Sequence, residues 1–152
     1  MKKNILRNQK GALLVETIAA IGILTMLSLL AMPLLQRYRS NLDLNGISKD
    51  LTSDLRLAQQ LTISEQNIHL IQFDTAAKNY SLLKLSPATT TVKSISLPAG
   101  TSYQAIDSNL NNQVRFNSFG GVSQSGKIVL INTLSKTATI NIKPSGYVEL
   151  QQ

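Results

Sequence analysis

The stretch KNILRNQKGALLVETIAAIGILTMLSLLAMPLLQRYRS, residues 3–40, determines the organisation of the chain. A basic leader comes first. After Gly11 an apolar run follows, in which Glu16 is the only charged residue as far as Leu35. At about 1.5 Å per residue, a helix over residues 12–35 is long enough to cross a hydrocarbon core of roughly 30 Å. The composition changes after Arg37. The sequence therefore predicts a membrane-embedded helix that carries a separate head.

Three kinds of membrane segment can be compared with this run. A cleaved secretory signal has a shorter apolar region, about 7–15 residues, and a small-x-small cleavage site, which the end of this run (LLAMP, residues 29–33) does not offer. A signal anchor fits the length, and the basic leader predicts a cytoplasmic N-terminus and an external head. An ordinary anchor gives no reason for Glu16, since a carboxylate costs on the order of 2.5–3.5 kcal/mol at the centre of a bilayer.

The residues around Gly11 carry a resemblance that accounts for Glu16. Gly11 followed by ALLVET and a long apolar helix resembles the class III signal of type IV pilins and pseudopilins. The resemblance implies that a prepilin peptidase cuts between Gly11 and Ala12 and methylates Ala12, a position where the family usually has Phe. The Glu16 carboxylate would then pair with the amino terminus of a neighbouring subunit in a filament. The other interpretation places Glu16 near the headgroups, favoured by the helix dipole.

The same resemblance implies the partners and the location of the chain. The partners would be other major and minor pseudopilins, the prepilin peptidase, membrane lipid and, indirectly, the inner-membrane assembly platform and its ATPase. The chain would cross the cell membrane once, with its N-terminus in the cytoplasm and its head outside. After assembly it would be part of a filament at the cell surface.

Helical periodicity continues beyond the apolar run. Asp43, Asp54 and Arg56 lie off an apolar stripe with steps of three and four. We expect one helix from residue 12 to about residue 65, kinked at Pro33 because proline lacks a backbone donor. The stripe consists of Leu44, Ile47, Leu51, Leu55, Ala58 and Leu61.

The rest of the chain consists of short β-branched or alternating segments, separated by turn residues such as those of 98–100 (PAG) and 144–146 (PSG). A long helix followed by antiparallel strands predicts an α+β fold, in which the sheet of the head covers the second half of the helix. The pilin resemblance implies the same type IV pilin-like fold. The predicted strands are residues 68–73, 80–85, 92–97, 114–117, 128–132, 137–143 and 147–150.

The order of segments in the head extends the resemblance to minor pseudopilins of the GspH/FimT type. The helical segment 51–64 is followed by IHLIQF (68–73), NYSLL (79–83), VRFN (114–117) with a Gly-rich turn, KIVL (127–130) and INIKPSGYV (140–148). The Cys-free, Gln-rich helix and the compact ending are especially similar to the competence pseudopilin ComGD of Gram-positive bacteria. The resemblance divides the chain into a leader (1–11), a transmembrane or filament-core helix (12–36), the second half of the stalk helix (37–67) and a β-rich head (68–152).

Two functions follow from this division. The resemblance implies a non-catalytic minor pseudopilin or prepilin subunit that assembles into a type IV pilus-like filament, of the competence or type II secretion kind, above all for DNA uptake in transformation. The alternative is a membrane-anchored binding module whose basic head captures DNA or another extracellular ligand. Only the first function requires processing after Gly11.

The sequence offers little for catalysis, and we expect no enzyme, no cofactor and no metal. The single histidine, His69, lies in a predicted strand on the same face as Ile71 and Phe73, so we interpret it as structural. Without a second histidine or a cysteine, no nucleophile–base pair suggests itself. Residues 107–111 (DSNLN) have the spacing of a calcium loop but lack its Gly and closing Glu, so we interpret them as an Asx-rich turn.

The head is mildly basic, because eleven basic and seven acidic residues from Arg37 onward leave a net charge of +4. Clustered cations are what phosphate contacts need. Some FimT-type relatives use a basic C-terminal tail to bind DNA, but here no Arg or Lys follows Lys143. The other interpretation is an ordinary solvated surface. The possible weak DNA contacts are Arg115, Lys127 and Lys143, with Arg56, Lys93 and Lys136 as further members of a basic face.

Overall fold

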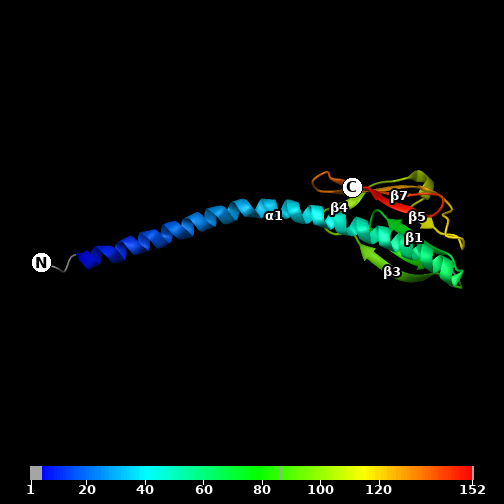
Figure 1. Cartoon of the computed structure of the whole chain (residues 1–152), viewed down its shortest axis with the longest axis horizontal. Coiled ribbons are helices and arrows are strands. Elements are labelled where there is room, and N and C mark those ends of the chain that lie inside the picture. The colour runs from blue at the N-terminus through cyan, green and yellow to red at the C-terminus, as the bar shows by residue number, and fades with distance from the viewer. Residues whose placement is uncertain (1–4, 86, 152) are drawn as a thin grey trace. The chain divides into compact units, whose positions relative to one another are not determined.

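The structure is a computed structural model that describes residues 5–85 and 87–151; for residues 5–10 and Leu30 it describes the backbone alone. The chain forms two compact units, Met1–Tyr38 and Arg39–Gln152. One helix, α1 (Ile5–Glu65), contributes to both units, and the strands belong to the second (Figure 1). Within the predicted leader, residues 1–4, including Lys2 and Lys3, lie outside the described residues.

Helix α1 ends at Glu65, as the periodicity predicts, and begins at Ile5, so leader residues 5–11 are also helical. At its C-terminal end Gln66 turns into the left-handed region (φ 52°), and its side-chain amide donates to the carbonyl oxygen of Ile63 at 2.7 Å. This capping satisfies one of the carbonyl groups that a helix end leaves free. Pro33 lies inside the helix. The kink at Pro33 stays a prediction.

The second unit contains two four-stranded antiparallel sheets rather than the single sheet expected. The first sheet has the order β3-β2-β1-β5 and the second β4-β6-β7-β8. Seven of the strands match predicted segments to within two residues, and β4 was not predicted. The bounds are β1 His69–Asp74, β2 Asn79–Lys84, β3 Thr90–Ser96, β4 Thr101–Ile106, β5 Gln113–Arg115, β6 Gly126–Asn132, β7 Thr137–Ile142 and β8 Val148–Gln151, with a short 3-10 helix, η1, at Ser108–Leu110.

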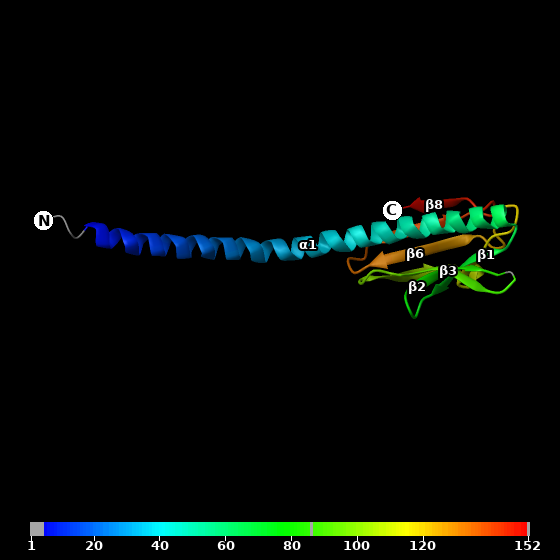
Figure 2. The same cartoon turned by 90° about the horizontal axis from the view of Figure 1, so that it is seen from below.

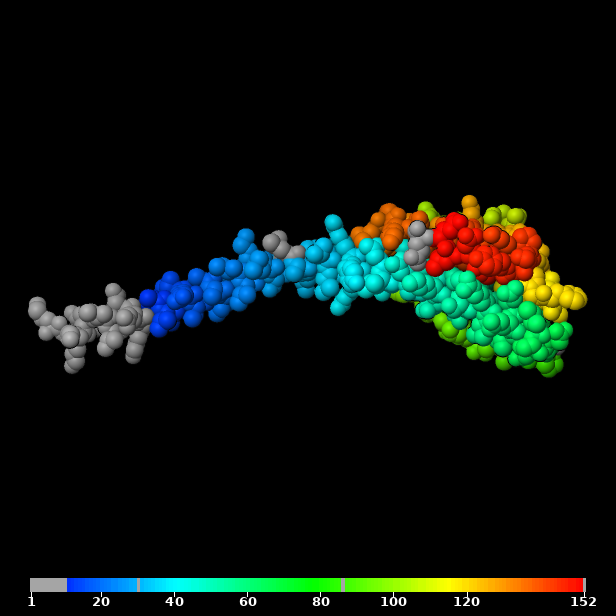
Figure 3. Space-filling model, viewed as in Figure 1, coloured from blue at the N-terminus to red at the C-terminus, as the bar shows by residue number. Residues whose placement is uncertain are grey.

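The core of the second unit forms where the apolar stripe of α1 meets both sheets (Figure 2). From Leu44 to Ala58 the predicted stripe is buried, while the opposite side of the same segment stays on the surface, cyan to green in Figure 3. Each sheet contributes alternate residues to this core, as its period of two requires. The strand residues in the core include Ile71, Phe73, Tyr80, Leu82 and Val114 from one sheet and Ile128, Leu130, Ile140, Ile142 and Val148 from the other.

Asp54 lies off the apolar stripe, as its spacing predicts, but its side chain is buried all the same. Only 4% of the residue is exposed. Its carboxylate accepts a hydrogen bond from Tyr80 Oη at 2.8 Å and forms an ion pair with Lys93 Nζ at 2.7 Å. Burial of a carboxylate is tolerated when donors of this kind compensate for the lost water. The triad therefore joins the middle of α1 to strands β2 and β3.

Because Tyr80 is buried and bonded to Asp54, we expect the free energy of unfolding of the head to fall at alkaline pH. Burial, and the hydrogen bond and charge of Asp54, raise the pKa of Tyr80 above its ordinary value of 10.0, and burial likewise raises the pKa of Tyr103. A raised folded-state pKa means that the unfolded chain ionises first, so stability is full below pH 10 and falls above it, by at most about 1.4 kcal/mol per pH unit for each group.

Tyr80→Phe should therefore make the alkaline loss of stability less steep. Urea unfolding of the full chain in detergent, followed by circular dichroism from pH 8 to 11.5, measures the slope. Tyr147→Phe is the matched control because Tyr147 is 55% exposed. Equal slopes for the two variants would contradict the assignment to Tyr80.

At the C-terminal end of α1, three segments that are distant in sequence pack closely together. Gln59 Nε2 donates to the carbonyl oxygen of Gly120 at 2.6 Å. Gly146, in the turn before β8, lies against the same carbonyl group, so that a Cβ atom there would overlap it. Both glycines have positive φ values, 83° and 82°, which glycine adopts without strain. This junction joins the helix to the loop after β5 and to the β7–β8 turn.

Candidate functional site on helix α1

The first unit exposes a long apolar surface. All described side chains of residues 11–38 are exposed, and the large apolar ones of residues 13–35 are between 53% and 73% exposed. Among the described residues, α1 is the one helix long and apolar enough to cross a membrane. An apolar surface of this extent is not stable in water, so lipid or other helices must cover it.

The serine and threonine hydroxyl groups within this surface are satisfied by the helix itself. Thr17 Oγ1 donates to the carbonyl oxygen of Leu14 at 2.9 Å, Thr25 Oγ1 to that of Gly22 at 2.8 Å, and Ser28 Oγ to that of Leu24 at 2.8 Å. Such back-bonding to the preceding turn lets a hydroxyl enter an apolar environment at little cost. These three residues therefore need no partner outside the helix.

Glu16 differs from these hydroxyl groups. Its side chain is exposed, and among the described side chains it has no hydrogen-bond donor and no cation as a partner. A carboxylate only accepts hydrogen bonds, so it cannot donate to a carbonyl oxygen of the preceding turn as Thr17 does. In lipid or in a helix bundle, its charge requires a donor from elsewhere. Glu16 is thus the one charged residue between Gly11 and Leu35, and no described side chain of the chain compensates its charge.

Gly11 and Ala12 lie side by side at the start of the apolar surface, and both are exposed. A Cβ atom added at Gly11 would have no neighbour within 4 Å, and the same holds for Gly22, six residues beyond Glu16. Packing within the chain therefore does not require glycine at residue 11. Processing between Gly11 and Ala12 remains a prediction.

His69 has the structural position that the sequence predicts. It is 1% exposed; Nδ1 lies 3.0 Å from the carbonyl oxygen of Asn67, and Nε2 lies 3.7 Å from a carboxylate oxygen of Glu65. The hydrogen bond from Lys84, together with its charge, lowers the pKa of Glu65. Residues 107–111 form a turn around η1, in which the backbone N–H of Leu110 donates to the carbonyl oxygen of Asp107 at 2.9 Å.

The basic residues proposed for DNA contact do not share one sheet. Arg115 lies in β5 of the first sheet, whereas Lys127 lies in β6 of the second and Lys143 directly follows β7. Lys143 forms an ion pair with Glu149 at 3.3 Å, and Lys93 is engaged by Asp54. Phosphate binding needs several unpaired cations close together. The pairing of Lys143 and Lys93 therefore weakens the basic face that the sequence suggests.

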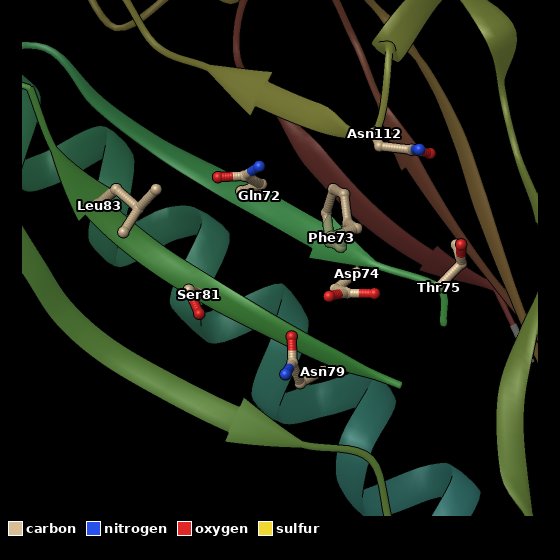
Figure 4. Close-up of a pocket in the computed structure, with 8 residues that line it drawn as sticks. All are labelled: Gln72, Phe73, Asp74, Thr75, Asn79, Ser81, Leu83 and Asn112. Atoms are coloured by element: carbon tan, nitrogen blue, oxygen red, sulfur yellow. The ribbon is translucent and has the colours of Figure 1, made fainter. Parts of the chain in front are cut away.

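A shallow polar depression of about 430 Å³ lies on the first sheet, where β1 and β2 approach the residue before β5 (Figure 4). Asp74 Oδ1, its one acidic group, already accepts hydrogen bonds from the backbone N–H groups of Ala76 and Ala77. The lining contains no histidine or cysteine that could pair with a nucleophile. Its residues are Gln72, Phe73, Asp74, Thr75, Asn79, Ser81, Leu83 and Asn112.

The chain shares its fold with solved minor pseudopilin and minor pilin structures. The minor pseudopilin EpsH from the type 2 secretion system of Vibrio cholerae superposes with a TM-score of 0.60 at 11% identity, over 72% of this chain and 96% of that one. The type IV minor pilin FimU of Pseudomonas aeruginosa also gives 0.60, at 13% identity, over 76% and 92%. No protein-family model and no curated protein matches the sequence. The type IV pilin-like α+β fold is thereby confirmed.

Proposed function

We propose that this chain is a non-catalytic minor pseudopilin or pilin-like subunit of a type II secretion or type IV pilus-like system. Its apolar surface on α1 would first anchor it in the membrane and then pack among the helices of a filament. The observation that carries this proposal is Glu16, an exposed carboxylate without a described partner in a surface where the hydroxyl groups of Thr17, Thr25 and Ser28 are satisfied within the helix. The fold shared with EpsH and FimU supports it.

A filament gives Glu16 the partner that the single chain does not show. If the chain is cut after Gly11, Ala12 gains a positively charged amino group. In a bundle of such chains, the amino group of one subunit can meet the carboxylate of the next, and an opposite charge within about 4–6 Å favours both charged forms. Because either charge alone would be costly among apolar side chains, the pair also fixes how far one helix is displaced along its neighbour.

The proposed function is tested by measuring whether the chain is cut after Gly11. The chain, expressed in cells that contain a prepilin peptidase and purified from membranes, should have an intact mass that begins at Ala12. Gly11→Val should retain the leader, whereas the matched control Gly22→Val should be cut normally. A Cβ atom at either glycine would meet no neighbour within 4 Å, so a difference between the variants reflects recognition by the peptidase. An intact leader in the unsubstituted chain would contradict the proposal.

We also propose that the filament serves DNA uptake, because of the resemblance to competence pseudopilins in the helix and the compact ending. Deletion of the gene should abolish transformation and leave protein secretion unchanged. The alternative, a membrane-anchored module whose head itself captures DNA, depends on Arg115, Lys127 and Lys143. The ion pair of Lys143 with Glu149 speaks against that alternative. Salt-dependent binding of DNA to the purified chain in a polarisation titration would favour it.

A further inference from the structure

The turn between β6 and β7, residues 133–136, is fixed to the first residues of α1 that belong to the second unit. Asn132 is 5% exposed, and its Nδ2 donates to the carbonyl oxygen of Ser40 at 3.3 Å and to Asn41 Oδ1 at 3.0 Å. Thr133 Oγ1 lies 3.1 Å from Ser40 Oγ. We call residues 133–136 the basal turn. Its position relative to residues 40–41 of α1 is set by these contacts.

Asn132 also fixes the shape of the basal turn. Its Oδ1 accepts hydrogen bonds from the backbone N–H groups of Leu134 at 3.0 Å and Lys136 at 2.9 Å, while Ser135 adopts a φ of 61°. One buried side chain thus binds both the turn and the helix. A loop held in this way loses little conformational entropy when it meets a partner.

The basal turn presents an apolar side chain next to positive charge. Leu134 is 43% exposed at the tip, and Lys136 beside it is exposed. Arg39, next to Ser40, is exposed as well, and neither cation has an ion-pair partner among the described side chains. Asp43 is the nearby acid on α1, and Arg37 adds a further cation in the sequence. An exposed leucine flanked by an excess of cations is complementary to the anionic headgroup layer of a bilayer.

The number of residues between Leu35 and Ser40 limits the distance between the end of the apolar run and the part of α1 that contacts the basal turn. Ser40 follows Leu35 by five residues. Five residues span about 7.5 Å as helix and at most about 18 Å when fully extended. Whatever the angle between the two units, the part of α1 that contacts the basal turn therefore begins within roughly 20 Å of the point where the apolar run ends. The headgroup layer of a spanned membrane begins at that point.

We propose that the basal turn is a contact site for an anionic phospholipid surface in the membrane-inserted, unassembled subunit. Leu134 enters the boundary between headgroups and acyl chains, and Lys136 and Arg39 meet the phosphate groups. This inference rests on the proposed function, because it requires that the apolar run spans the membrane. Beyond that function, the head itself is held against the bilayer, and assembly of the subunit into a filament breaks this contact.

The experiment uses the full chain in lipid vesicles, and the absence of cysteine from the sequence makes single-site labelling simple. Ser135→Cys places a fluorescent label at the tip of the basal turn. Ser123→Cys is the matched control, because Ser123 is an exposed serine in the loop after β5. Gly120 of the same loop packs on Gln59, and Gln59 lies about 28 Å along α1 from Ser40. The vesicles consist of phosphatidylcholine with or without phosphatidylglycerol, and acyl chains carrying bromine quench any label that reaches them.

The label at residue 135 should be quenched in vesicles with phosphatidylglycerol, and the label at residue 123 should not. A lysine near an anionic surface contributes about 1 kcal/mol, so Lys136→Glu should lower the ratio of quenched to unquenched label at residue 135 about fivefold or more. Leu134→Ser should also reduce quenching. Unquenched label at residue 135, or equal quenching at both sites, in a chain that floats with the vesicles would overturn this inference alone. A chain that fails to float would overturn the membrane anchor as well.

Discussion

Replacing Glu16 with alanine should remove the chain from filaments while its insertion into the membrane continues. Within a bundle, the variant would leave the amino terminus of a neighbouring subunit buried without its counter-charge. Removing one partner of a buried ion pair typically costs about 3–5 kcal/mol, which corresponds to at least a hundredfold loss of incorporation. The fraction of the chain in sheared filaments, relative to the membrane fraction, measures this loss. Glu16→Gln, which keeps the shape and removes the charge, should behave similarly.

Thr17→Ala is the matched control for this result. Thr17 lies next to Glu16 in the same exposed surface, but its hydroxyl group is bonded to the carbonyl oxygen of Leu14. Its removal should leave incorporation near the level of the unsubstituted chain. Incorporation of Glu16→Ala at that same level would exclude a pairing role, and the interpretation of Glu16 as a headgroup-level carboxylate would then be preferred.

Gly146→Ala should cause the largest loss of stability expected in the second unit. A φ of 82° strains any residue with a Cβ atom by about 1–2 kcal/mol. The new methyl group would also overlap the carbonyl oxygen of Gly120 and crowd Gln59 Nε2, so the two loops must separate and the bond between Gln59 and Gly120 must break. We expect a total loss of about 3 kcal/mol or more, which lowers the midpoint of thermal unfolding by about 12 °C or more.

Gly100→Ala separates the two contributions to this loss. Gly100 has nearly the same φ, 86°, but a Cβ atom there would approach only the side chain of Thr133, at 3.2 Å. It should therefore lose only the conformational contribution, about 1–2 kcal/mol. Thermal unfolding of both variants in detergent, followed by circular dichroism, gives the comparison. Equal losses would show that the contact with Gly120 is relaxed without cost.

The parts of the fold that depend on local pattern were predictable from sequence. The C-terminal end of α1 and seven of the strands follow from periodicity and turn residues, since hydrophobic spacing along one segment determines which face is buried. The strand β4 (TSYQAI) was missed because its apolar side chains do not alternate cleanly. It pairs with β6 at a sheet edge, with a register shift between Tyr103 and Ala105. The segment is a strand because it pairs with β6, which its own sequence pattern does not indicate.

Features that depend on distant pairing were not predictable. The division into two sheets requires knowing which strands pair, and Asp54 is buried because Tyr80 and Lys93, 26 and 39 residues further along, supply its donors. Glu16 drew attention in the sequence because it interrupts an apolar run, and Gly11 because it resembles the cleavage position of a prepilin signal; the roles of both residues stay predictions. Asn132, which organises the basal turn, gave no signal in the sequence, since its contacts with Ser40 and Asn41 span more than 90 residues.

The position of β8 in the core has a consequence for biosynthesis. Val148 of β8 is 1% exposed in the core that α1 shares with the sheets, and Arg56 of α1 donates a hydrogen bond to its carbonyl oxygen at 3.0 Å. The turn before β8, which contains Gly146, packs against Gln59 of α1 and the carbonyl group of Gly120. Contacts this distant in sequence form slowly, because a long loop must close before they contribute. The head therefore cannot complete its core until β8 has been synthesised. If the head is exported, as the proposed function requires, the apolar part of α1 would enter the bilayer while the domain behind it is still unfolded and can pass through a narrow channel.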